Sequence, residues 1–80
     1  MNGRDRAKLV WRCRRGMREL DMLLTGYMEQ AFDAAEPAEQ AAFETLLSLP
    51  DPEILDLLTG RMTAQDPRLQ HVVERLLSDS

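Results

Sequence analysis

Residues 13–21 read Cys-Arg-Arg-Gly-Met-Arg-Glu-Leu-Asp, and they join three cations, a glycine and two carboxylates at the start of the longest predicted helix. Glycine inside a helix costs roughly 1 kcal/mol relative to alanine. Gly16 is therefore expected at a junction between helices, or where another backbone must come close. Considered alone, the segment is also compatible with an ordinary helix start that carries a solvated charged turn.

Outside this segment the apolar residues recur at helical spacing, and no stretch alternates as a half-buried strand would. Before it, the spacing predicts a short helix over about residues 5–13, with Leu9, Val10 and Cys13 inside. After it, the spacing predicts a helix over about residues 16–34. The inner stripe of this second helix is formed by Met17, Leu20, Leu24, Tyr27, Met28 and Ala31.

Three acid–proline pairs mark further helix starts: Glu36-Pro37, Asp51-Pro52 and Asp66-Pro67. Proline suits the first helical position, and an aspartate before it can cap the helix. Gly60 is expected to close the helix that begins at Asp51. The predicted buried sides of the three helices are Ala41, Phe43, Leu46, Leu47 and Leu49, then Ile54, Leu55, Leu57 and Leu58, then Leu69, Val72, Val73, Leu76 and Leu77. The sequence therefore predicts an all-α protein, a small five-helix bundle, with residues 1–80 as a single domain.

The chain of 80 residues is near the lower limit for a domain that folds without covalent or metal staples. Its single cysteine excludes an internal disulfide and, by itself, a metal site. No apolar run is long enough to span a bilayer, and the N-terminal arginines precede no apolar signal region. We therefore expect a cytoplasmic protein without membrane insertion. We also expect a monomer, although no feature of the sequence determines the oligomeric state.

The net charge of −4 hides a strong asymmetry along the chain. Residues 1–18 hold seven basic residues against one acid, whereas the remainder holds three against thirteen. A basic arm on an acidic body either docks within the molecule or meets a partner with an acidic surface. An arginine-rich arm can also bind nucleic acid, but the acidic body would repel phosphate, so we predict no nucleic-acid partner.

Catalytic chemistry has few candidate residues. His71 is the only histidine, and we expect its side chain at or near the surface. Cys13 lies among arginines, which can lower a thiol pKa, but no histidine is near it in sequence, so we prefer an inert thiol. Glu19 and Asp21 are two residues apart and cannot face each other on a helix. The sequence predicts a protein that is not an enzyme and binds no metal.

If residues 15–21 are helical, a step of 100° per residue separates their side chains into two groups. Arg15, Gly16 and Glu19 then share one exposed patch, where a donor fork and an acceptor pair flank a flat centre. Asp21 falls on the opposite shoulder of the helix. We expect Asp21 to support the bundle, for example by pairing with an arginine of the first helix.

Three apolar side chains of this region could add contact area to such a patch: Trp11, Met17 and Met22. Methionine and tryptophan are enriched in protein interfaces. For Trp11, however, burial in the core is the preferred interpretation, because it is the only tryptophan of a small bundle. Met22 points away from the predicted core and is either an interface residue or simply exposed.

The pattern as a whole resembles the SdhE or YgfY family of small bacterial flavinylation factors. The resemblance covers Trp11 to Asp21, Phe43 to Leu47, Asp51-Pro52 and the Leu-Thr-Gly of Leu58 to Gly60, in the family's order. One departure is Leu57, which stands where many members have a tryptophan before that Leu-Thr-Gly. The difference leaves the predicted fold intact and concerns packing or a contact at the end of the fourth helix.

The resemblance implies a five-helix assembly chaperone that binds the flavoprotein subunit of succinate dehydrogenase, or of fumarate reductase, and promotes covalent FAD attachment. It implies a central contact formed by Arg15, Gly16 and Glu19, with Asp21 in the same signature. The flanking partner-binding candidates are Arg14, Arg18, Trp11 and Met17. The chain has no dinucleotide fingerprint, so we expect no tight FAD binding by the chain itself. An antitoxin-like or regulatory protein-binding module is the alternative.

Overall fold

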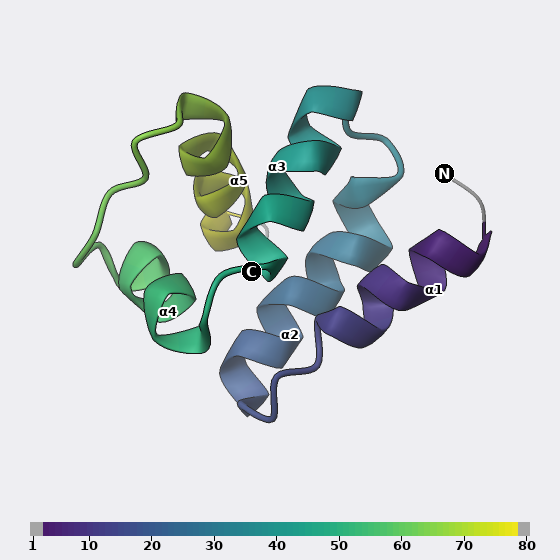
Figure 1. The fold of residues 1–80 in the computed structure, drawn as a ribbon, viewed down its shortest axis with the longest axis horizontal. Helices are drawn as coiled ribbons and strands as arrows, with labels where there is room; N and C mark the ends of the chain where they lie inside the picture. The colour runs from purple at the N-terminus through teal and green to yellow at the C-terminus, as the bar shows by residue number, and fades with distance from the viewer. Residues whose placement is uncertain (1–2, 79–80) are drawn as a thin grey trace.

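The computed structural model of the protein describes residues 3–78, with side chains from Asp5 to Ser78. Over this part of the chain the elements are α1 (Gly3–Arg12), α2 (Arg18–Tyr27), the π-helical turn η1 (Met28–Phe32), α3 (Pro37–Leu47), α4 (Asp51–Thr59) and α5 (Pro67–Ser78). In Figure 1, α2 and α3 occupy the middle, with α1 on one side and α4 and α5 on the other. The predicted all-α class and its five helices are confirmed, while the predicted domain 1–80 extends at both ends beyond the described residues.

The core is built from the inner side of α2 and η1, against which α3 and α5 pack. Its centre is a cluster of three aromatic rings, in which the centroid of Phe43 lies 4.4 Å from that of Tyr27 and 5.8 Å from that of Phe32. Each of these side chains is almost fully buried. Such ring contacts add to the stabilisation from apolar burial. The fully buried aliphatic neighbours include Leu20, Leu24, Met28, Leu46, Ile54, Val72, Val73 and Leu76.

The predicted long helix begins two residues later than expected, at Arg18, and passes from α2 into the π-helical turn η1. A π turn inserts extra backbone into the helix and changes which residues face inward. Here it keeps Met28, Ala31 and Phe32 inside together. Phe32 thereby joins the aromatic cluster, a core residue that the regular helical spacing did not predict.

The start of α4 differs from its prediction. The helix begins at Asp51 itself, with Pro50 as the flanking extended residue and no side-chain cap. The predicted capping role of Asp51 is therefore wrong, and its carboxylate instead pairs with Arg15, 3.4 Å away. The end of the helix is as predicted, because Gly60 follows it with φ +82°, a left-handed conformation that glycine adopts without strain.

The other two predicted starts are confirmed. Pro37 is the first residue of α3. Before α5, the Asp66 side chain accepts a hydrogen bond of 2.9 Å from the backbone N–H of Arg68, as expected of an aspartate that precedes a helix.

Four predicted inner residues are exposed. Trp11 is 76% exposed, Leu77 is 47% exposed and Met17 is 38% exposed, while Ala41 is also exposed. For Trp11 and Ala41 the reason is angular, because each lies on the side of its helix opposite the buried residues. Met17 precedes α2 in an extended conformation and so does not belong to its inner stripe.

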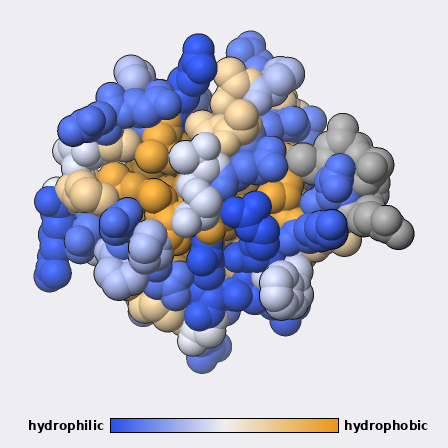
Figure 2. All heavy atoms as spheres, viewed as in Figure 1, coloured by the Kyte–Doolittle hydropathy of each residue, from blue (hydrophilic) through white to orange (hydrophobic). Residues whose placement is uncertain are grey.

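The surface combines hydrophilic residues with limited apolar areas. Figure 2 shows apolar atoms over α4 and α5 and beside α2, bordered by hydrophilic side chains. Among the described residues, each helix is too short or too polar to cross a bilayer.

Gly26 offers a direct test of the helical account of α2. It lies inside the helix, and a Cβ added there would meet no atom within 4 Å. We expect Gly26→Ala to raise the free energy of unfolding by about 0.5–1 kcal/mol, because alanine favours the helix. Gly60→Ala is the matched control and should lower that free energy, because φ +82° strains a residue with a Cβ. Urea unfolding measures both, and a destabilised Gly26→Ala would contradict the account.

Candidate functional site

The loop between α1 and α2 contains the glycine of the 13–21 segment. Gly16 is exposed and adopts φ +82°, and Met17 then leads into α2 in an extended conformation. The prediction that Gly16 marks a junction is confirmed. No other backbone of the described residues comes close, because a Cβ at Gly16 would meet no described atom within 4 Å, and a close approach by the backbone of a partner stays a prediction. The glycine therefore serves the turn.

Asp21 closes this turn from the first turns of α2. Its Oδ1 accepts a hydrogen bond of 2.6 Å from the backbone N–H of Arg15. A carboxylate that accepts from a backbone N–H forms a strong, charge-assisted hydrogen bond. Asp21 thus supports the fold, as expected, but through a backbone group and not through the expected arginine side chain of the first helix.

Arg15 does not share an exposed patch with Glu19, so that prediction is wrong. The Arg15 side chain is only 19% exposed and extends to the junction of α3 and α4. Its guanidinium donates to the carbonyl oxygen of Leu47 and lies 3.4 Å from a carboxylate oxygen of Asp51. The helical geometry assumed for residues 15–21 fails because the left-handed turn at Gly16 separates Arg15 from α2.

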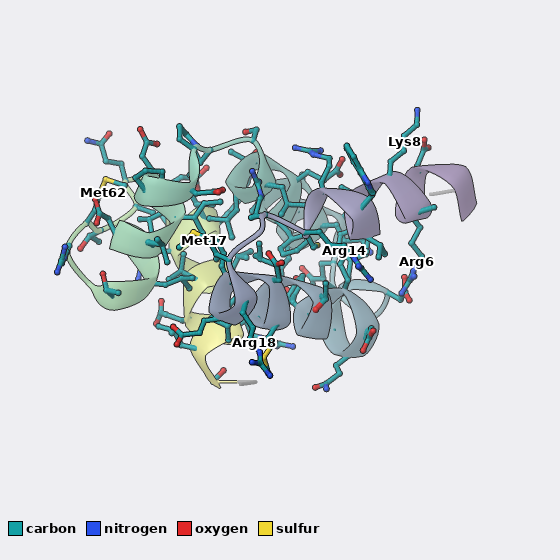
Figure 3. All side chains as sticks on the ribbon, turned by 90° about the horizontal axis from the view of Figure 1, so that it is seen from below. Arg6, Lys8, Arg14, Met17, Arg18 and Met62 are labelled. Atoms are coloured by element: carbon teal, nitrogen blue, oxygen red, sulfur yellow. The ribbon has the colours of Figure 1, made fainter. Side chains whose placement is uncertain are left out.

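A groove lies between α1 and α2, beside this loop. It encloses about 500 Å³ and is lined by Val10, Arg14, Gly16, Arg18, Asp21, Met22, Thr25, Met28 and Glu29. We call it the α1–α2 groove. Figure 3 shows Arg14 between the two helices and Arg18 pointing outward from the start of α2. Four of the predicted partner-binding residues therefore line one concave surface.

The other four predicted partner-binding residues lie around the groove or away from it. Trp11 is exposed on the outer side of α1, and its carbonyl accepts a 3.1 Å hydrogen bond from the backbone N–H of Arg14. Glu19 is exposed on α2 but does not line the groove. Figure 3 shows Met17 on the other side of the loop from Arg14. Arg15, as described above, turns to α3 and α4.

Two wall residues of the groove, Thr25 and Glu29, were not predicted from the sequence. The side chains that α2 and η1 contribute include Arg18, Met22, Thr25 and Glu29. Their spacing of four, three and four residues is that of one helical face. This pattern could have identified the groove face, but its mixture of charged, apolar and hydroxyl side chains gives no hydrophobic signal.

The basic arm docks partly within the molecule. Arg6 forms an ion pair of 3.1 Å with Asp33 and donates a 3.0 Å hydrogen bond to the Met28 carbonyl. Arg12 donates to the Glu44 carbonyl at 3.5 Å. Together with Arg15, these arginines attach the arm to the body. Arg14 and Arg18 remain exposed, so the positive charge of the groove lies at its Gly16 end.

Cys13 is a buried core residue. Its Sγ donates to the carbonyl of Leu9 at 3.2 Å. Burial raises the pKa of the thiol to about 11, although the nearby charges of Arg15 and Arg12 lower it. Both features support the interpretation as an inert thiol, because desolvation outweighs the arginines.

His71 lies on α5, where its side chain is 58% exposed, as predicted. Its Nε2 is 2.9 Å from Glu39, whose other carboxylate oxygen accepts a 2.6 Å hydrogen bond from the Tyr27 hydroxyl. The three residues connect α5, α3 and α2. This contact chain borders a second groove of about 630 Å³ between η1, α3 and α5, which the 13–21 segment does not reach.

Comparison with known proteins assigns the chain to a family. Residues 7–80 match the family described as flavinator of succinate dehydrogenase. The FAD assembly factor SdhE of Methylococcus capsulatus is 42% identical over 72 residues, which cover 90% of this chain and 87% of that protein. That of Haemophilus ducreyi is 38% identical over 72 residues, covering 90% and 88%. That of Idiomarina loihiensis is 33% identical over 75 residues, covering 94% and 83%.

The raised pKa of Cys13 predicts that the free energy of unfolding falls at alkaline pH. The folded pKa of about 11 exceeds the ordinary value of 9.0, so folding favours the protonated thiol. This contribution is complete below pH 9 and is lost as the pH rises from 9 to 11. We expect the free energy of unfolding of the wild type to fall by about 1–3 kcal/mol relative to Cys13→Ala over this range. Urea unfolding at several pH values measures the difference, and a constant difference would contradict the assignment.

Proposed function

The chain belongs to the family of succinate dehydrogenase flavinators, and on this premise we propose that it binds the flavoprotein subunit of succinate dehydrogenase and promotes covalent FAD attachment. The same proposal extends to the flavoprotein subunit of fumarate reductase. The chain acts as a monomer in the cytoplasm, and FAD belongs to the partner and not to the chain.

The observation that carries this proposal is the position of the α1–α2 groove within the family signature. Its lining takes Arg14, Gly16, Arg18 and Asp21 from the segment through which the chain resembles the flavinylation factors. Exposed Met22 lies in the same lining, and its side chain is 65% exposed. The lining combines three apolar side chains, from Val10, Met22 and Met28, with two exposed arginines at one end. Such a lining suits an acidic, partly apolar surface of a protein partner.

Trp11 does not line the groove but lies three residues before Arg14, on the outer side of α1. A tryptophan that is 76% exposed leaves a large apolar area in water. Tryptophan and arginine are the residue types that most often dominate interface energetics. We propose that Trp11 and Arg14 form the α1 side of the partner contact. Met17 and Glu19 contribute at its margins.

The role we propose is one of positioning. Covalent flavin attachment joins a partner side chain to a flavin that the partner also binds. A protein that holds the surrounding partner domain in the reactive arrangement raises the rate without supplying a reacting group. The buried thiol of Cys13 and the Glu39-paired His71 lie outside the α1–α2 groove, so neither is given a catalytic part in this proposal.

The charge of the groove tests the proposal. We expect the double substitution Arg14→Glu and Arg18→Glu to weaken binding to the apo-flavoprotein subunit by about tenfold or more at low salt, because two attractive contacts become repulsive. Arg61→Glu with Arg68→Glu is the matched control, since these arginines are also exposed and the net charge changes equally. Binding is measured by fluorescence anisotropy, and covalent flavin by in-gel fluorescence of the flavoprotein subunit with FAD added.

The two double variants separate a specific contact from general attraction. Only the Arg14 and Arg18 variant should lose binding and flavin fluorescence, and its remaining binding should depend less on salt. Equal losses for both pairs would contradict the proposed site. A wild-type chain that leaves the covalent flavin yield unchanged would contradict the proposed function.

A further inference from the structure

We propose that Arg15 is a positioning residue that acts through Asp51 and Asp21, and not a contact residue for the partner. This inference deepens the proposed function, and the binding measurement that tests it rests on that function. It gives Asp51 a role in the site: Asp51 holds Arg15 in place. Asp51 lies outside the 13–21 segment and does not line the groove.

Arg15 is held at its backbone by α2 and at its side chain by the α3–α4 junction. Its backbone N–H donates to Asp21 at 2.6 Å. Its guanidinium reaches residues more than thirty positions away in the sequence, namely Leu47 and Asp51. A residue fixed at both ends has little freedom to rotate, so the loop that contains it is fixed as well.

The chemistry of the α3–α4 junction explains why an arginine stands here. Leu47 is the last residue of α3, where backbone carbonyls have no partner within the helix and carry partial negative charge. Asp51 begins the next helix and adds a full negative charge. A guanidinium can donate to both acceptors from its planar fork, whereas a lysine offers one compact charge.

The neighbours of Arg15 on either side are the residues that face the groove. Arg14 and Gly16 both line it, while the Arg15 side chain extends away from it. The contacts of the Arg15 side chain with α3 and α4 therefore determine where the Arg14 guanidinium and the Gly16 backbone lie. Loss of the Asp51 carboxylate should change the groove although Asp51 does not touch it.

The experiment compares Asp51→Asn with Glu53→Gln. Both residues lie in the first turn of α4 and both changes remove one carboxylate, but Glu53 is exposed. In the free chain we expect Asp51→Asn to shift the amide resonance of Gly16 in an ¹H–¹⁵N spectrum, and Glu53→Gln to leave it in place. With the apo-flavoprotein subunit, we expect Asp51→Asn to weaken binding about fivefold and Glu53→Gln less than twofold, in keeping with a partly buried ion pair.

A double-mutant cycle then distinguishes positioning from contact. Arg15→Gln alone is expected to weaken binding by about tenfold, and the double variant with Asp51→Asn no further, because both changes remove the same interaction. If Asp51→Asn binds as the wild type does, or if the two losses multiply, Arg15 acts on the partner directly and the inference is overturned. An unmoved Gly16 resonance overturns it as well.

A folding control and a replacement variant distinguish a loss of binding from a loss of folding. Circular dichroism and urea unfolding establish that each variant is folded at the assay concentration. If Asp51→Asn is unfolded, Arg15→Lys replaces it, since it keeps a charge for Asp51 but loses the fork, and it should shift Gly16 and weaken binding in the same direction. If wild-type chain does not bind the flavoprotein subunit, the proposed function fails, while the Gly16 resonance still decides the positioning of the loop.

Discussion

The hydrogen bond from the Arg15 backbone N–H to the Asp21 carboxylate fixes how α1 returns along α2. It forms only because Gly16 adopts a left-handed conformation that brings the loop back over the start of the helix. The Cys13 side chain fills the core immediately before this turn, and Leu20 fills it immediately after. The groove between the two helices is a consequence of that turn, because its walls are the facing sides of α1 and α2.

Within the 13–21 segment, residues that hold the fold together are interspersed with exposed residues. Cys13 and Leu20 are buried, Arg15 and Asp21 hold the loop, Gly16 makes the turn, and Arg14, Arg18 and Glu19 are exposed. The signature by which the chain resembles its family therefore combines residues that shape the surface with residues that we propose contact the partner. The charged residues of the motif therefore have roles in folding and in partner contact, and none of them needs to take part in a chemical reaction.

Local chemistry in the sequence predicted the helices well. The acid–proline pairs and Gly60 mark helix boundaries by their own backbone preferences, and regular apolar spacing identified most of the core. The site was predicted less well because its geometry depends on one backbone angle. A helical wheel extended through Gly16 placed Arg15 beside Glu19, whereas the turn sends Arg15 to residues of α3 and α4 that no local pattern connects with it. The exposure of Trp11 was missed because α1 buries only a narrow face.

The most direct test of the central claim is a map of the partner contact on the chain. Isotope-labelled chain is titrated with the apo-flavoprotein subunit, and the amide resonances that broaden or shift are recorded. We expect the changes to concentrate at Gly16, Arg18 and Met22 and to extend to Trp11, while residues of the second groove, such as Ala38 and His71, are unchanged. Changes centred on the second groove, with the Gly16 loop unaffected, would contradict it.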